Sequence, residues 1–395
     1  MRKYFKHYLI YYLLLFNSSE AFSQIKYIRV LWSVKPESEA TISWFTKENS
    51  KKNEVLISTS KKNILIKKNI STIKTNYSRK LSNGSFFVHH VNLENLKPNQ
   101  NYYFKIKSSS SVSKIYYFRT APKDKQKGFS LLFGGDSRSN RETRQEMNRL
   151  VKKKFTENSD ILALVHGGDF IYDGRKWSEW KMWLEDYSKT YTDDFRVLPL
   201  MVTRGNHEKD KKLFNEIFNW PGRGNVYYTT EIGNFSLLTL NTEISIAGNQ
   251  REWLQNELER LSVSHKWILT NYHRPAWPAV KSPGLALQQW VPLFEKYKVN
   301  LVFESDGHVL KKTVPIKANK INLKEGIIYL GEGGLGVKQR IPTKKDAWYL
   351  QSPGYAESFH HLYVLSVLAE KLSVDVILKD GSVYDKFFIF PKQRI

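Results

Sequence analysis

Residues 161–172 read Ile-Leu-Ala-Leu-Val-His-Gly-Gly-Asp-Phe-Ile-Tyr. The run from Ile161 to Val165 has the length and the β-branched content of a buried strand. Two glycines follow the run and let the backbone turn sharply, so that Asp169 points into a cleft at the strand end. In an open α/β sheet, ligands gather at the carboxyl ends of the strands. This stretch therefore predicts an α/β layered domain with a ligand site that includes Asp169.

Four other segments repeat the arrangement of an apolar run followed by polar side chains. The runs cover residues 129–133, 197–202, 266–269 and 299–303. The side chains that follow them, in chain order, are Asp136, Asn206 with His207, His273, and Asp306 with His308. Carboxylate, amide and imidazole groups that meet at one sheet edge make a metal pocket. Two cations roughly 3.5–4 Å apart would hold a hydroxide and clamp the oxygens of a displacement at phosphorus. The neighbouring His207 can then act as a general acid without binding metal.

The length and composition of the chain exclude several classes of protein and of metal site. The chain has 395 residues, 41% of them hydrophobic, which is enough for two domains with a large core. Its formal net charge is +24, but the lysines are scattered through every region, which favours compositional bias over a dedicated basic groove. We find no zinc-finger, helix-turn-helix or RNP-like pattern, so no specific nucleic-acid partner is expected. The absence of cysteine excludes thiolate metal sites and favours a bacterial periplasmic or secreted protein over an exported eukaryotic one.

Residues 1–23 have the pattern of a secretory signal peptide. A basic start is followed by the short apolar run from Tyr8 to Phe16 and by Ala21-Phe22-Ser23, which resembles a cleavage site. Roughly 20 apolar residues are needed to span a bilayer, so no membrane span is expected after cleavage. An uncleaved membrane anchor is the alternative.

The mature chain divides into two predicted domains. Residues 24–121 contain six or seven short strand-like runs separated by turn signals, which is typical of a fibronectin-III-like or immunoglobulin-like β-sandwich. Residues 122–128 are polar and unpatterned, and we interpret them as a linker. From 129 to 395, strands alternate with amphipathic helices, which predicts an α/β domain.

Several of these blocks together resemble the calcineurin-like metallophosphoesterases. They are Gly135-Asp136, Gly168-Asp169-x-x-Tyr172, Gly205-Asn206-His207-Glu208, His273 and Gly307-His308. The tyrosine three residues after Asp169 resembles the purple acid phosphatase branch, and so does the leading β-sandwich. The resemblance covers nearly the whole mature chain. It implies a catalytic domain of α/β/β/α layers and a centre of two metal ions.

The resemblance also implies the ligands of each ion. The first site would take Asp136, Asp169 and Tyr172, where a tyrosinate suits ferric iron. The second site would take the bridging Asp169 with Asn206, His273 and His308, and would hold zinc, iron or manganese. The family pattern Gly-His-x-His ends in a histidine that completes the first site, but this chain has Leu310 there. Three interpretations stay open: Glu304 or Asp306 substitutes, a water fills the position, or the protein is largely mononuclear.

These features predict an exported hydrolase of phosphate monoesters in which a metal-bound hydroxide attacks phosphorus and His207 serves as the acid. Arg138 and Arg274 are the candidate contacts to the substrate phosphate, although a surface arginine is an equal interpretation of Arg138. A phosphodiesterase that uses the same site is the first alternative. The second is a catalytically impaired protein that binds anionic polymers.

Overall fold

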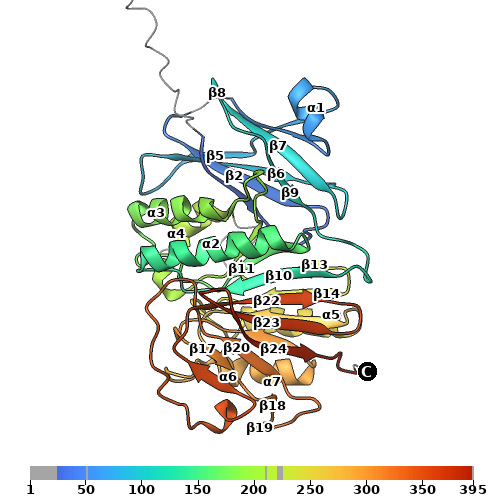
Figure 1. Ribbon diagram of the computed structural model, residues 1–395, viewed down its shortest axis with the longest axis vertical. Coiled ribbons are helices and arrows are strands. Elements are labelled where there is room, and N and C mark those ends of the chain that lie inside the picture. The colour runs from blue at the N-terminus through green and yellow to red at the C-terminus, as the bar shows by residue number, and fades with distance from the viewer. Residues whose placement is uncertain (1–24, 50–51, 210, 220–225, 394–395) are drawn as a thin grey trace, which may run out of the picture.

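The computed structural model of the chain describes residues 25–49, 52–209, 211–219 and 226–393. The predicted signal peptide lies outside the described residues. Figure 1 shows the N-terminal strands at one end of the molecule and the short helices α6 and α7 toward the other. Within the described ranges, no helix combines the length and the apolar character that a bilayer crossing requires.

A ten-stranded sheet forms the centre of the molecule. Its strands, in spatial order, are β24 (Val383–Ile389), β23 (Leu372–Leu378), β22 (His361–Val367), β10 (Phe129–Gly134), β11 (Ile161–His166), β12 (Leu200–Val202), β1 (Lys26–Leu31), β2 (Ala40–Thr46), β6 (Phe87–Leu93) and β5 (Tyr77–Lys80). The first six strands belong to the predicted catalytic domain and the last four to the predicted sandwich. Strands β1 and β12 pair in parallel, with Leu31 opposite Leu200. One sheet therefore runs through both domains.

A second, seven-stranded sheet lies against the catalytic half of the first. It consists of β13 (Tyr228–Ile232), β14 (Phe235–Thr239), β15 (Trp267–Asn271), β16 (Leu301–Phe303), β20 (Ile328–Gly331), β17 (Leu310–Lys312) and β21 (Tyr355–Glu357). Alternate residues of a strand face opposite sides, so Phe133 of β10 stacks on Phe303 of β16 with ring centroids 3.7 Å apart. The residues of β10 that alternate with Phe133, such as Leu132, face the helices instead.

Helices cover the outer face of each sheet. They are α2 (Arg141–Glu157), α3 (Trp177–Tyr187) and α4 (Lys211–Phe218) on the first sheet, and α5 (Asn249–Ser262), α6 (Ala286–Gln289) and α7 (Val291–Lys296) on the second. Asn140 caps α2 by accepting a hydrogen bond from the backbone N–H of Thr143. The apolar stripe of α2, with Met147, Val151 and Phe155, is buried against the sheet. The catalytic part thus has the α/β/β/α layers that the resemblance implied.

The N-terminal part is completed by a five-stranded sheet. Its strands are β4 (Ser71–Lys74), β3 (Asn53–Ser58), β7 (Asn101–Ser108), β8 (Ser111–Val112) and β9 (Tyr116–Arg119), and a small hairpin elsewhere joins β18 (Ile316–Lys317) to β19 (Lys320–Ile321). This sheet and β1, β2, β6 and β5 form the predicted β-sandwich. One short helix, α1 (Lys61–Ile66), interrupts what we expected to be an all-β segment. Residues 122–128, the predicted linker, contain neither helix nor strand.

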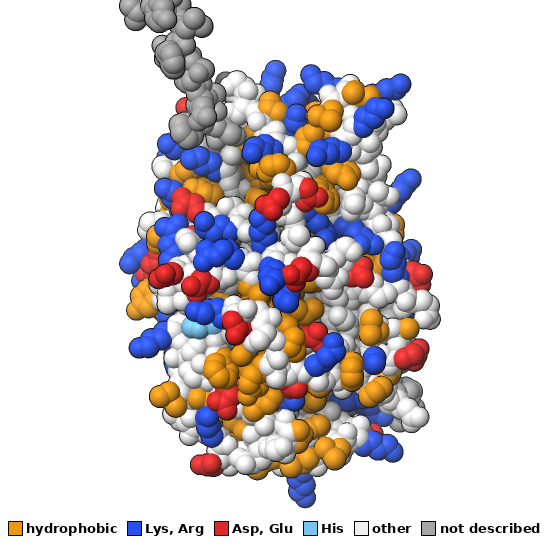
Figure 2. All heavy atoms as spheres, in the orientation of Figure 1, with side chains coloured by type: hydrophobic (Ala, Val, Ile, Leu, Met, Phe, Trp, Pro, Cys, Tyr) orange, Lys and Arg blue, Asp and Glu red, His pale blue; other side chains and the backbone are white. Residues whose placement is uncertain are grey.

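The charged side chains do not gather into one groove on the face that Figure 2 shows. Lysine and arginine side chains are spread over this whole face, with aspartate and glutamate among them.

Candidate metal centre

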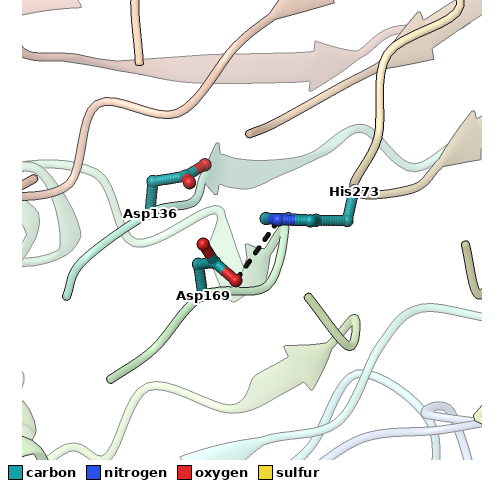
Figure 3. Close-up of side chains that lie close together, drawn as sticks. All are labelled: Asp136, Asp169 and His273. Carbon is teal, nitrogen blue, oxygen red and sulfur yellow. Dashed lines mark ion pairs between the residues drawn. The ribbon is translucent and has the colours of Figure 1, made fainter. Parts of the chain in front are cut away.

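Three strand ends bring acidic and imidazole side chains together between the two sheets. Asp136 follows β10, Asp169 follows β11 and His273 follows β15, and all three side chains are buried. One ligand atom from each lies within 4.8 Å of the others. Figure 3 shows the three side chains pointing toward a common space, with an ion pair between Asp169 and His273. The predicted convergence at the carboxyl ends of the strands is therefore present in the fold.

The ring of His273 is oriented like that of a metal ligand. Its Nδ1 lies 2.9 Å from the carbonyl oxygen of Gly167, so Nδ1 carries a proton and donates it there. This leaves Nε2 facing acceptor oxygens, at 3.3 Å from Asp169 Oδ1 and 3.6 Å from Asp306 Oδ1. Asn206 Oδ1 is also 3.3 Å from Nε2. A backbone carbonyl that fixes the second nitrogen is the usual support of a metal-bound histidine.

The buried carboxylates of this cluster favour a positive charge among them. Burial alone lowers the pKa of His273, but the nearby carboxylates, Asp169 foremost, outweigh it and raise this pKa well above its ordinary value. Burial likewise raises the pKa of Asp169, yet His273 and His207 hold it far below the usual range. The cluster therefore stabilises either a proton or a cation at Nε2 of His273.

Asp136 supplies the test of whether a metal ion fits. Its Oδ2 accepts a hydrogen bond of 2.9 Å from the backbone N–H of Asp306. Its Oδ1 is buried and has no hydrogen-bond partner among the described residues, although His308 Nε2 lies 3.2 Å away. A buried carboxylate oxygen without a partner is costly. Donor atoms bound at about 2.1 Å to one cation lie about 3.0–3.4 Å apart, so the spacing of these donors fits a metal ion.

The backbone at four of these positions is held in a left-handed conformation. The φ angles are 56° at Asp136, 55° at Asp169, 68° at Asp306 and 60° at His308. Such a conformation costs about 1–3 kcal/mol of conformational energy at a residue other than glycine, and it is found most often at functional sites. It turns each side chain from the strand direction into the space between the sheets.

Glu208 braces the loops that carry the ligands, a role that the sequence analysis did not assign. Its buried carboxylate accepts hydrogen bonds from the backbone N–H groups of Gly205 at 2.6 Å, Phe170 at 2.8 Å and Asp169 at 3.0 Å. Burial and the charge of Asp169 raise the pKa of Glu208 to about 8. Its place three residues after Gly205, the N-cap of a short 3-10 turn, is the signal that could have revealed it.

His207 lies at the edge of the cluster. Its backbone N–H donates to Asp169 Oδ1 at 2.9 Å. Its Nδ1 donates to the carbonyl oxygen of Tyr172 at 2.6 Å, and its Nε2 is 3.9 Å from Asp169 Oδ2. The Nε2 atom is therefore the ring nitrogen available to a bound substrate. Burial lowers the pKa of His207, against the opposing effect of Asp169.

The side chains of Tyr172 and Arg274 make no hydrogen bond or ion pair to Asp136, Asp169 or His273 among the described residues. The Tyr172 ring lies beside His207, with ring centroids 5.1 Å apart. Tyr172 is 56% exposed, and among the described residues its hydroxyl makes no hydrogen bond. Arg274 is held by Glu243, with its Nε 2.7 Å from Oε1. Leu310, at the position of the missing histidine, is fully buried in the apolar core.

The two acids that could have replaced that histidine, Glu304 and Asp306, have different partners in the structure. Glu304 is paired with the buried Lys311 and accepts hydrogen bonds from the Tyr272 hydroxyl and the Ala276 N–H, both at 2.7 Å. Glu304 is thus occupied away from the cluster. Asp306 faces His273, as given above, and also pairs with Lys281.

Arg138 points into the cluster. Its Nε lies 3.1 Å from Asp169 Oδ2 and its Nη2 lies 3.4 Å from His308 Nε2. Only 12% of its side chain is exposed. It is therefore not the surface arginine that the sequence allowed.

Two known families match the sequence. "Purple acid Phosphatase, N-terminal domain" matches residues 25–120, and "Calcineurin-like phosphoesterase" matches residues 135–310. A curated relative, purple acid phosphatase 15 of Arabidopsis thaliana, is 22% identical over 316 residues, which are 67% of this chain and 57% of the relative. The chain thus spans a little more than half the length of that relative.

Solved structures have the same fold. A purple acid phosphatase from yellow lupin (Lupinus luteus) seeds superposes with a TM-score of 0.77 at 18% identity, over 93% of this chain and 74% of the other. A structure of PhoD superposes with a TM-score of 0.70 at 12% identity, over 95% of this chain and 93% of the other. At these identities the two structures establish the fold.

Proposed function

The chain belongs to the purple acid phosphatase-like branch of the calcineurin-like metallophosphoesterases, which are metal-dependent hydrolases, and on this premise we propose that it hydrolyses phosphate monoesters. The observation that supports the proposal is the buried cluster of Asp136, Asp169 and His273, whose ligand atoms lie within 4.8 Å of one another. A bound divalent cation supplies a Lewis acid for a phosphoryl oxygen and generates the nucleophile from water.

The residues of the chain would hold and orient the ester. The Nε2 atom of His207 faces the cluster, because its Nδ1 is fixed on the Tyr172 carbonyl. In the proposal, His207 acts in its doubly protonated form: Nδ1 keeps its hydrogen bond to Tyr172, and Nε2 gives the second proton to the leaving oxygen of the ester. Arg138, whose guanidinium lies beside Asp169, places a permanent positive charge next to the anionic phosphate.

A groove lined in part by Arg274 offers room for the organic part of the ester. Its volume is about 480 Å³, and its lining includes Thr242, Ile244, Arg274 and Leu285. The ion pair of Arg274 with Glu243 fixes the arginine at the groove wall. In the proposal Arg274 contacts substrate there.

The identity of the metal belongs to the proposal as well. Carboxylate, amide and imidazole donors in a chain without cysteine suit zinc, iron or manganese. The family uses a dinuclear centre. The donors around His273 fit one ion, whereas Leu310 cannot supply the ligand that the resemblance assigns to the first site at that position.

Export is the last part of the proposal. We propose that residues 1–23 direct the chain to the bacterial periplasm or the medium and are removed. Amino-terminal sequencing of the protein recovered from the periplasm checks this, and a mature chain that still begins at Met1 would contradict it.

Hydrolysis of a generic aryl phosphate tests the activity. Chelation should abolish turnover by the wild type, and added zinc or manganese should restore it. The variant Asp169→Ala should stay inactive under every metal. The matched control is Asp193→Ala, which removes an aspartate whose side chain is 94% exposed and should keep the wild-type rate.

Two outcomes would select the alternatives. Faster turnover of a bis-aryl phosphate than of the monoester would identify a phosphodiesterase. No turnover under any metal, together with binding of polyphosphate that survives Asp169→Ala, would identify a binding protein instead.

A further inference from the structure

The guanidinium of Arg138 is engaged on each of its three nitrogen atoms. Nε donates to Asp169 Oδ2 at 3.1 Å, and Nη1 donates to Ser139 Oγ at 3.0 Å. Nη2 lies 3.4 Å from His308 Nε2, and the group sits 5.8 Å from the centre of the Tyr172 ring. An arginine with these contacts is fixed in place.

Asp169 divides its two oxygens between two partners, His273 and Arg138. Oδ1 faces His273 Nε2 at 3.3 Å, which is the side where the donors fit a metal ion. Oδ2 faces Arg138. A carboxylate that bridges two cations would use the same two sides. Arg138 therefore occupies the Oδ2 side of Asp169, where a second metal ion would bind.

The other donors expected on that side do not compete with Arg138. Leu310 cannot ligate and packs in the apolar core. The Tyr172 ring is exposed and receives the guanidinium against its ring, which is a cation–π contact. Leu310 removes a ligand from that side, and Arg138 brings a charge into it.

We propose that Arg138 takes the place of the first metal ion, and that the protein binds one metal ion per chain, at the donors around His273. The guanidinium keeps its charge at every pH at which the protein folds. The centre would then consist of one exchangeable cation and one cation that is built into the chain.

The balance of charge agrees with a single ion. Asp136, Asp169 and Asp306 bring three negative charges to the cluster, and all three are buried. Arg138 and Lys281 bring two positive charges, through their ion pairs with Asp169 and Asp306. One divalent ion leaves the group with a single positive charge. A second divalent ion would add like charge beside the guanidinium.

The test counts metal ions in the full-length mature protein. The chain is saturated with zinc, desalted and analysed by mass spectrometry for metal per chain, and circular dichroism verifies the fold of every variant. We expect one ion in the wild type and two in the double variant Arg138→Gly/Leu310→His. The matched control Arg274→Gly/Leu310→His, which removes the arginine paired with Glu243, should bind one.

A spectroscopic readout accompanies the count. Loaded with ferric iron, the wild type should lack the visible absorption of a tyrosinate bound to iron, because in the proposal Arg138 occupies the side that Tyr172 faces. The double variant should absorb visible light, and the further change Tyr172→Phe should remove that absorption.

The outcomes decide the proposal without reference to turnover. Two ions, or none, in the wild type would overturn it, and so would a folded double variant that still binds one. Should the double variant fail to fold, the wild-type count alone decides. An inactive protein that binds one zinc ion would refute the proposed hydrolysis and leave this inference standing.

Discussion

Removal of Lys311 should destabilise the protein by breaking a fully buried ion cluster. Its ammonium contacts Glu304, lies 3.0 Å from Glu332 Oε1 and donates to the Trp277 carbonyl oxygen at 2.8 Å. All three charged side chains have no exposure. Burial raises the pKa of Glu332 to about 7 even with Lys311 beside it. The variant Lys311→Met would leave two buried carboxylates without a cation.

The expected loss follows from comparable buried pairs. Removing one partner of such a pair costs about 3–5 kcal/mol. An unfolding entropy of about 2.1 cal/mol/K per residue gives roughly 0.8 kcal/mol/K for a chain of this size, so the melting temperature should fall by roughly 4–6 °C. The His308 backbone should loosen as well, because its N–H donates to the Glu332 carbonyl oxygen at 2.6 Å.

Differential scanning fluorimetry measures the shift. The matched control is Lys345→Met, which removes a half-exposed lysine 3.1 Å from Glu357 and should change the melting temperature by less than about 1 °C. A Lys311→Met variant that melts within about 1 °C of the wild type would show that the cluster adds nothing to stability.

Three further predictions concern the ligand loops and the N-terminal domain. A methyl group on Gly205 would lie 2.4 Å from Asp169 Oδ1, so Gly205→Ala should weaken zinc binding about 10–100-fold; an unchanged affinity in calorimetry would refute this. Glu208→Ala removes the acceptor of three buried N–H groups and should lower the free energy of unfolding in urea by about 3 kcal/mol, whereas a loss below about 1 kcal/mol would contradict the role given to Glu208. Burial and the positive charge of Arg29 lower the pKa of His90 to about 3. Because the folded state resists protonation of His90, its contribution is complete above pH ~6.5 and falls by about 1.4 kcal/mol per unit as the pH drops toward 3. Urea denaturation between pH 7 and 4 should show a shallower decline for His90→Gln, and equal slopes would count against this assignment.

The residue pattern predicted an α/β domain and the side chains that meet at its strand ends, and the family resemblance implied the layers. Apolar runs of strand length, each followed by a polar side chain and in two cases by glycine before it, locate Asp136, Asp169 and His273 at strand ends. Parallel strands bring such ends to one edge. This pattern is local in the chain, and for that reason it can be read without coordinates.

Other features depend on pairing between distant segments. The contact of Arg138 with Asp169 and the pairing of Lys311 with Glu332 join side chains from different loops or strands, and no local pattern distinguishes them from surface charges. The signal in the sequence is that Lys311 and Lys312 follow Leu310 in the short strand β17, which is buried. The helix α1 escaped prediction because its lysine-rich sequence has little apolar periodicity.

The pairing of β1 with β12 has a consequence for anyone who wishes to work with the hydrolase part alone. Cutting the chain before Phe129 would remove β1, one of the two neighbours of β12. The free edge of β12 would then have unpaired N–H and C=O groups. That strand leads directly to Asn206 and is entirely buried. A truncated protein would therefore expose an unpaired strand edge close to its metal-binding loop. Expression should yield aggregates unless another strand is engineered to pair with that edge.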